Sequence, residues 1–310
     1  MKIISLNGSP SLKNTCAAIG IFDGVHRGHQ FLIRKMLSAA RRLKAQPIVI
    51  TFFPHPAHVI RPDVKLEYLT SLEERFQLLN KLGVAACIVL RFDRKFARIP
   101  PEKFIKDILV KKLGVKAVYV GHDFRFGKDR RGDIALFEQL ARESGYEIHA
   151  VAGFKAGGEV ISSSRIRKLI IDGQIKSAAK LLGRPVSVSG KIVKGSKRGK
   201  NLGYPTANVD YGSIIIPPQG VYIVSVLVGA KKYPAIANIG MRPTFKERSP
   251  KLLLEVHILD FSRNIYGKEM RVEFLQKVRN EMKFEGLKDL VQQIKKDEAL
   301  ARRYFSRRSI

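Results

Sequence analysis

The chain contains no tryptophan, two cysteines and few acidic residues. Cys16 and Cys87 are too few and too far apart for a disulfide framework or a thiolate metal cluster, which favours a reducing compartment. No run approaches the roughly 20 apolar residues of a membrane span, and the N-terminus lacks the apolar core of a signal peptide. We therefore expect a cytoplasmic protein with no membrane partner.

The shortage of acidic residues leaves a strongly basic chain, with 57 Lys and Arg against 27 Asp and Glu and a formal net charge of +30. Such a surplus is compatible with nucleic-acid binding, because cations that neutralise phosphates give a salt-dependent affinity. The basic residues are spread along the whole chain and form no recognisable nucleic-acid module. This spread favours a solvated basic surface and disfavours a nucleic-acid partner.

Through the first half of the chain, apolar strand-like runs alternate with helix-like segments. We expect strands at 17–22, 48–53, 86–90, 117–120 and 147–152, and helices at 72–82, 102–113 and 133–144. Such alternation implies right-handed crossovers and a mainly parallel sheet. The first half is therefore predicted to be an α/β domain.

After Pro185 the pattern changes to short strands separated by glycine and proline turns. Residues 186–193, 221–228, 252–259 and 270–275 show a period of two, and an amphipathic helix is expected from about 287 to 304. This spacing predicts a small antiparallel β-barrel with a terminal helix. With 310 residues and 45% apolar content, we expect two domains, 1–184 and 185–310.

The segment Gly20–His29 lies where a predicted strand passes into a helix. Gly24 and Gly28 let the backbone approach a phosphate, the first amides of the helix favour an anion, and His26 and His29 can donate hydrogen bonds to phosphoryl oxygens. This combination predicts attack on a nucleoside triphosphate. On spacing alone, one turn of an ordinary surface helix or half of a zinc site explains the two histidines equally well.

The same run resembles the HxGH signature of the cytidylyltransferase-like nucleotidyltransferases, and its longer form, FDGVH, is similar to their FAD synthetase branch. A second signature of that superfamily stands at 161–167 as ISSSRIR. The resemblance implies a Rossmann-like domain in which His26 and His29 stabilise the α-phosphoryl transition state. It also implies that the nucleotide and flavin are bound by Phe22, Asp23, Gly24, Gly28, Ser163, Ser164 and Arg167. Ser164 stands where that family commonly has threonine, which keeps the hydroxyl.

Two more loops, 51–56 and 121–127, are expected to leave strands at the same sheet edge. They resemble FAD synthetase segments that shape the ATP and FMN pocket, which implies contacts from Pro54, His55, Asp123, Phe124 and Arg125. Packing of the phenylalanine pairs at 52–53 and 124–126 in the core is the alternative. His55 and His58 repeat the HxxH spacing, but we expect Pro56 to prevent a helical turn there, which argues against a zinc site.

In the second half, the glycine-rich basic segment 195–208 ends in Pro-Thr-Ala-Asn. Lys197, Arg198 and Lys200 can meet phosphate charge, and the oxygens of Thr206 and Asn208 suit Mg²⁺. The segment resembles the signature of riboflavin kinases, and stretches at 238–245 and 254–261 strengthen the likeness. The resemblance implies that ATP and flavin are contacted by Gly195, Lys200, Gly203, Asn238 and Arg242, with Thr206 and Asn208 as metal ligands.

The alternation within 252–258 separates Glu255 and His257 from Leu254 and Val256. The carboxylate is therefore expected off the core face, where it can orient or accept the proton of an attacking hydroxyl. Glu255 also matches the catalytic glutamate of riboflavin kinases, whereas an exposed strand glutamate is the alternative without that likeness. The stretch 279–284 resembles their C-terminal flavin-side segment.

Together these likenesses cover nearly the whole chain, which resembles the bifunctional bacterial riboflavin kinases and FAD synthetases. The resemblance implies that riboflavin and MgATP give FMN in the C-terminal domain, and that FMN and MgATP give FAD and pyrophosphate in the N-terminal domain. Two alternatives stay open at this point: a variant with one activity, and a flavin-responsive nucleic-acid binder. The oligomeric state also stays open.

Overall fold

The computed structural model describes residues 1–5, 12–195, 203–241 and 252–307. Contacts between residues divide the chain into two compact units. The first contains residues 1–67 and 72–163, and the second contains residues 68–71 and those from 164 onward. Residues 68–71 join the second unit through a bridge between Tyr68 and Ile214. The boundary expected between residues 184 and 185 stays a prediction.

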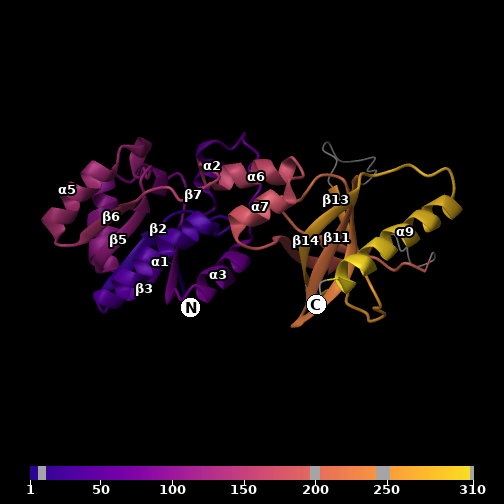
Figure 1. Cartoon of the computed structure of the whole chain (residues 1–310). Helices are drawn as coiled ribbons and strands as arrows, with labels where there is room; N and C mark the ends of the chain where they lie inside the picture. Colours follow the sequence, from indigo (N-terminus) through magenta and orange to yellow (C-terminus); the bar gives the residue numbers. More distant parts are fainter. Residues whose placement is uncertain (6–11, 196–202, 242–251, 308–310) are drawn as a thin grey trace. The chain divides into compact units, whose positions relative to one another are not determined.

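The first unit is built on a sheet of six parallel strands in the order β1-β4-β3-β2-β5-β6 (Figure 1). The strands are β1 (Lys2–Ser5), β2 (Thr15–Ile19), β3 (Gln46–Phe53), β4 (Ala86–Arg91), β5 (Val115–Gly121) and β6 (Glu147–Val151). The chain begins with β1 at one edge of the sheet, and β2 lies near its centre. From β2 the strands are added toward β1 as β3 and β4, and β5 is then added on the other side of β2. The loops after β2, β3 and β5 therefore leave at one sheet edge, next to the point where the strand order reverses, which is where ligands bind in open α/β sheets.

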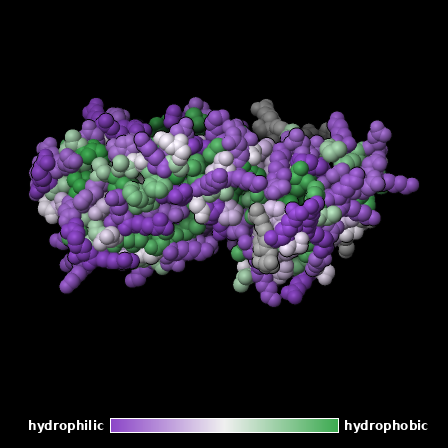
Figure 2. All heavy atoms as spheres, in the orientation of Figure 1, coloured by the Kyte–Doolittle hydropathy of each residue, from purple (hydrophilic) through white to green (hydrophobic). Residues whose placement is uncertain are grey.

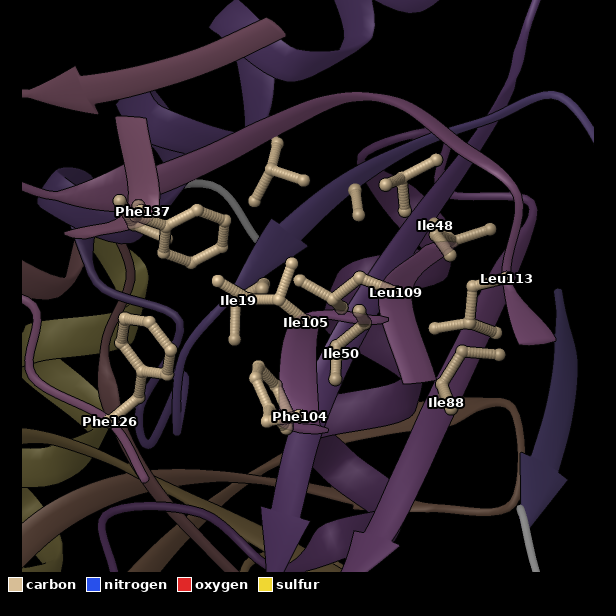
Figure 3. Packing of buried hydrophobic residues seen from close by; sticks show 14 of the residues in the cluster. Ile19, Ile48, Ile50, Ile88, Phe104, Ile105, Leu109, Leu113, Phe126 and Phe137 are labelled. Atoms are coloured by element: carbon tan, nitrogen blue, oxygen red, sulfur yellow. The ribbon is translucent and has the colours of Figure 1, made fainter. Parts of the chain in front are cut away.

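Helices cover both faces of this sheet. They are α1 (Arg27–Arg42), α2 (Pro56–Ile60), α3 (Leu72–Lys81), α4 (Pro101–Lys103), α5 (Ile134–Ser144), the 3₁₀ turns η1 (Phe96–Arg98) and η3 (Lys128–Arg130), and the π-helix η2 (Phe104–Lys112). Alternation along β2 sends Ala17 and Ile19 into a cluster with η2 and α5, and Cys16 and Ala18 into a second cluster with α1 and α3. Figure 3 shows the first cluster.

The parallel sheet and its main elements were predicted correctly, with three differences. The helix expected at 102–113 is mostly a π-helix, and the short strands β1, β7 (Lys155–Ala156) and β8 (Glu159–Val160) were not expected. The expectation that Pro56 prevents a helical turn is wrong. Pro56 begins α2 at the first helical position, where its fixed φ suits the helix and its missing N–H would have no partner in any case.

The second unit contains a closed antiparallel barrel in the order β10-β13-β12-β11-β14-β9. Its strands are β9 (Val186–Val193), β10 (Ala207–Asp210), β11 (Gly220–Val228), β12 (Lys231–Met241), β13 (Leu252–Ile258) and β14 (Glu269–Arg279). Four of these were expected, and the barrel is confirmed. Inward-facing residues such as Val188, Leu254 and Val256 fill it.

Among the described residues, the helices that accompany the barrel are α6 (Ser163–Ile171), α7 (Ile175–Leu182) and α9 (Leu287–Ser306). The terminal helix α9 lies along the outside of the barrel (Figure 1), where Ala301 is buried against Val221, Ile223 and Ile236. The apolar side of α9 therefore faces the outer surface of the barrel wall.

Candidate active sites

The Gly20–His26 loop leads directly from β2 into α1. His26 is the N-cap of α1, and its Nδ1 accepts a hydrogen bond from the His29 amide at 3.2 Å. Since Nδ1 accepts, the neutral imidazole carries its proton on Nε2. A Cβ added to Gly28 would lie 3.1 Å from the His26 ring, so a larger residue at this position would require the ring to shift by a few tenths of an ångström.

The two histidines form a stacked pair. Their ring centroids are 3.5 Å apart at an interplanar angle of 18°, and the Phe22 ring meets His29 edge-on at 5.2 Å. Burial, with the neighbouring His26 ring and the Arg75 guanidinium, holds the pKa of His29 well below its ordinary value of 6.5. In the described part of the chain, the buried His29 Nδ1 has no hydrogen-bond partner. A neutral histidine with an unused ring nitrogen suits a phosphoryl oxygen.

Asp23 is buried, not on the surface. Its side chain is 1% exposed and forms an ion pair with Arg75 of α3, with 3.3 Å between Oδ1 and Nη2. Its carbonyl oxygen accepts a hydrogen bond of 2.9 Å from the Ser163 hydroxyl. Ser163 therefore contacts the histidine loop, whereas Ser164 and Arg167 fall in the second unit.

The two neighbouring loops divide their residues between core and surface. Phe52 and Phe126 are buried in the sheet core, while Phe124 is half-buried and stacks on Phe126 at 5.6 Å. His55 caps α2 by accepting the Ala57 amide, and Pro54 precedes it half-buried. Asp123 and Arg125 are exposed, and Arg125 pairs with Asp133 at 3.0 Å. The core-packing alternative thus holds for one phenylalanine of each pair.

In the second unit, a polar row crosses the outer face of the barrel. Glu255 of β13 stands in register with Asn208 of β10 on one side and Asn238 of β12 on the other. Cross-strand neighbours in an antiparallel pair have Cβ atoms roughly 4.5–5.5 Å apart, so one carboxylate lies between two carboxamides. Leu254 and Val256 are buried in the interior, which confirms the expected alternation.

This row lines a pocket of about 620 Å³, a size typical of small-molecule sites. The pocket brings together Gly195, Thr206, Asn208, Asn238 and Glu255 from the expected site residues. Its wall is completed by His257, whose Nδ1 contacts the Pro205 carbonyl at 2.9 Å. Its apolar lining consists of Val193, Val221, Ile236, Met241, Leu253, Met282, Phe284, Leu290 and Ile294. Gly203 is exposed with a φ of 85°, and Lys200 and Arg242 lie outside the described residues.

Several lining residues were not assigned roles from the sequence. Arg279 and Asp297 form a two-pronged ion pair, with Nε to Oδ2 at 3.0 Å and Nη2 to Oδ2 at 2.8 Å. Asp297 occupies the apolar stripe of α9 that Leu290, Ile294 and Ala301 define. A charged residue on an apolar stripe is a sequence signal for a buried partner, and Arg75 on α3 gives the same signal between Leu72 and Leu79.

Comparisons with known proteins assign the two halves of the chain to two families. Residues 9–165 match the family described as FAD synthetase, and residues 182–305 match the family described as riboflavin kinase. The chain belongs to the bifunctional riboflavin kinase/FMN adenylyltransferase family. In this family assignment, the histidine loop falls in the FAD synthetase part and the Glu255 pocket in the riboflavin kinase part.

Relatives in the family cover nearly the whole chain. The bifunctional riboflavin kinase/FMN adenylyltransferase of Escherichia coli K12 is 41% identical over 93% of this chain and 91% of its own length. That of Listeria monocytogenes is 38% identical over 95% of this chain and 93% of its own. A crystal structure of a Streptococcus pneumoniae protein named as a macrolide-efflux protein has a TM-score of 0.86, with 32% identity over 97% of this chain and 99% of that one.

Hydrophilic side chains dominate the face of the molecule drawn in Figure 2, with smaller apolar areas between them. This agrees with the 57 basic residues, which have to be distributed over the outside of both units. None of the described helices is both long and apolar enough to span a membrane.

Proposed function

We propose that residues 1–184 transfer the adenylyl group of ATP to FMN, and that residues 185–310 transfer the γ-phosphoryl group of ATP to riboflavin. Membership of the family supports both reactions. The pocket beside Glu255 is the observation that carries the proposal, because it joins one carboxylate, two carboxamides and an apolar wall in a single cavity.

In the adenylyl transfer, an oxygen of the FMN phosphate attacks the α-phosphorus of ATP, a new P–O bond forms, and pyrophosphate leaves. The attacking phosphate makes a protein nucleophile unnecessary. His26 donates from Nε2, since its Nδ1 accepts the His29 amide. Neutral His29 offers a ring nitrogen that has no partner among the described residues. Both groups meet charge that develops in the transition state, while Ser163, whose hydroxyl contacts the Asp23 carbonyl, holds the triphosphate.

In the kinase reaction, the 5′-hydroxyl of riboflavin attacks the γ-phosphorus of ATP and ADP leaves. Glu255 accepts the hydroxyl proton as the new P–O bond forms. Asn208 and Asn238 flank Glu255 and can donate to phosphoryl oxygens or to the carboxylate. The flat ring system of the flavin suits the apolar wall, which includes Phe284 and Ile294.

Magnesium fits the donor set of this pocket. Thr206, Asn208 and Glu255 all offer oxygen, the ligand type that Mg²⁺ prefers, and all three line the pocket. Within the described residues, no group of three or more His, Cys, Asp or Glu side chains could hold a metal ion. Thr206 and Asn208 would therefore hold the ion together with ATP phosphates. When bound, Mg²⁺ neutralises phosphate charge during transfer.

We also propose a cytoplasmic location. The reactions consume ATP, and Cys16 and Cys87 are buried thiols, which suits a reducing compartment.

The two sites are tested by supplying riboflavin and FMN separately with ATP and Mg²⁺, and separating the products by chromatography. His29→Ala is expected to lower FAD formation by about 10²–10³-fold, the usual cost of one transition-state donor, and to spare FMN formation. Glu255→Gln is expected to lower FMN formation by about 10²–10⁴-fold and to spare FAD formation from FMN. Two matched controls, one in each unit, are His149→Asn, whose side chain is 41% exposed, and the exposed Glu269→Gln. Equal loss of both activities in either active-site variant contradicts the two-site assignment.

A further inference from the structure

The loop that carries the histidine pair has an unfavourable backbone. Phe22 and Val25 are not glycines, yet their φ values are 54° and 38°. Positive φ in a non-glycine residue costs roughly 1–3 kcal/mol and persists only where the surroundings hold it. The contacts that hold this loop therefore decide where His26 and His29 stand.

Arg75 makes two of these contacts, on either side of Phe22. Its Nη1 donates to the carbonyl oxygen of Ile21 at 2.9 Å, and its Nη2 lies 3.3 Å from Oδ1 of Asp23. The Thr51 hydroxyl donates to the same Ile21 carbonyl at 2.9 Å. One guanidinium from α3 thus fixes the residues before and after Phe22.

Phe22 and the loop's own backbone carry this anchoring to the histidines. The Phe22 ring packs edge-on against His29 at 5.2 Å. Three residues after Asp23, the His26 ring stacks on the His29 ring, and its Nδ1 accepts a hydrogen bond from the backbone amide of His29. Further along the loop, Gln30 donates to the Val25 carbonyl at 2.9 Å. A change at Asp23 or Ile21 therefore reaches both imidazoles through two or three contacts.

Burial of the ion pair also argues for a role beyond stability. The side chains of Asp23 and Arg75 are each 1% exposed. Taking both charges out of water is costly, and apolar residues of similar volume often stabilise a protein as well or better. An apolar pair could not donate to the Ile21 carbonyl, whereas the guanidinium fork meets a carbonyl and a carboxylate in one plane.

We propose that Arg75 is a positioning residue for adenylyl transfer, acting through the Gly20–His26 loop on His26 and His29 without touching substrate. The inference rests on the proposed adenylyl transfer at this pair. The charge of Arg75 has a second effect in the same direction, because it helps to keep His29 neutral beside His26. A neutral His29 preserves the stacked pair, in which two imidazolium rings would repel each other.

The test uses the full chain and measures kcat and KM for FAD formation from FMN and ATP in Arg75→Met and Arg75→Lys. Arg75→Met is expected to lower kcat by about 10²-fold, since small misplacements of catalytic groups have costs of this size, with KM values for ATP and FMN within about threefold of wild type. The kcat of Arg75→Lys is expected to be at least tenfold higher than that of Arg75→Met, because lysine keeps the positive charge and one hydrogen-bond donor. Lys81→Met removes an exposed charge from the same helix as the matched control.

Riboflavin phosphorylation by the same preparations reports whether the chain is folded. Where Arg75→Met lowers both activities, the double variant Asp23→Asn/Arg75→Met is measured in its place, because it also removes the buried negative charge that Arg75 balances, and Asp23→Asn alone serves as its reference. A folded variant with normal FMN formation and low kcat for FAD formation supports the proposal. Wild-type kcat in Arg75→Met or in the double variant overturns it. A wild-type protein that forms no FAD, or a fully active His29→Ala, instead refutes the function assigned to the histidine pair.

Discussion

Removal of the Asp297 carboxylate is expected to destabilise the second unit and loosen the α9 wall of the kinase pocket. Asp297 is 4% exposed and receives three hydrogen bonds from Arg279 and Gln293 at 3.0 Å or less, two of them from the guanidinium. In Asp297→Ala, Arg279 keeps its bond to the Asn280 carbonyl and loses its counter-ion. The Gln293 amide loses its partner as well.

The magnitude follows from burial. Breaking a buried ion pair by removing one partner costs about 3–5 kcal/mol. The Arg279 side chain is 18% exposed, so water can solvate part of the guanidinium and the lower end applies. We expect about 3 kcal/mol, which corresponds to a fall in Tm of roughly 6–12 °C for a unit of this size.

The assay is a double-mutant cycle by calorimetry with Asp297→Ala, Arg279→Ala and the double variant. The coupling energy is expected to exceed about 1.5 kcal/mol, because the second substitution removes a charge that the first left unpaired. The KM for riboflavin should rise in the same variants, since Arg279, Asp297 and Ile294 line the pocket. Single effects that add to within about 0.5 kcal/mol would show that the pair does not hold α9, and the reasoning from burial would fail.

Two further predictions concern buried titratable groups. Burial raises the pKa of Cys16 and of Cys87 to about 12, so neither thiol should react with an aromatic disulfide reagent at pH 8 until the chain is unfolded; rapid reaction in the native protein would contradict this. The pKa of His29 lies well below 6.5, so below about pH 6.5 the unfolded chain binds a proton that the native state excludes, and stability falls as the pH decreases. Denaturant unfolding at pH 7.5 and 5.5 should show a smaller loss in His29→Asn than in wild type, and equal losses would refute the assignment.

Features set by local periodicity could be predicted from the sequence. The outward position of Glu255 followed from a period of two, and its neighbours Leu254 and Val256 are indeed buried. The parallel sheet followed from alternating strands and helices. The likeness of FDGVH and Pro-Thr-Ala-Asn to known signatures pointed to the two sites, because these motifs combine several residue types in a fixed order.

Features that depend on partners distant in sequence could not be predicted in this way. Strand β12, which contains Pro234, was not among the strands expected from the sequence, and its pairing with β11 and β13 makes it a strand. The π-helix η2 buries Phe104, Ile105 and Leu109, a spacing that fits an α-helix nearly as well. Arg75 and Asp297 are buried as ion pairs with Asp23 and Arg279, which lie 52 and 18 residues away in sequence.

The position of the kinase pocket on the outside of a closed barrel has a consequence for protein engineering. Each strand of its wall presents alternate residues to two different environments, so Val256 belongs to the barrel interior while Glu255 and His257 belong to the pocket. Outward positions such as Leu253 can be randomised in libraries without disturbing the interior packing that closes the barrel, whereas Ile236 is kept because Ala301 of α9 packs against it. Selection on flavin analogues can thus explore new substrate preferences on a scaffold whose folding is largely left unchanged.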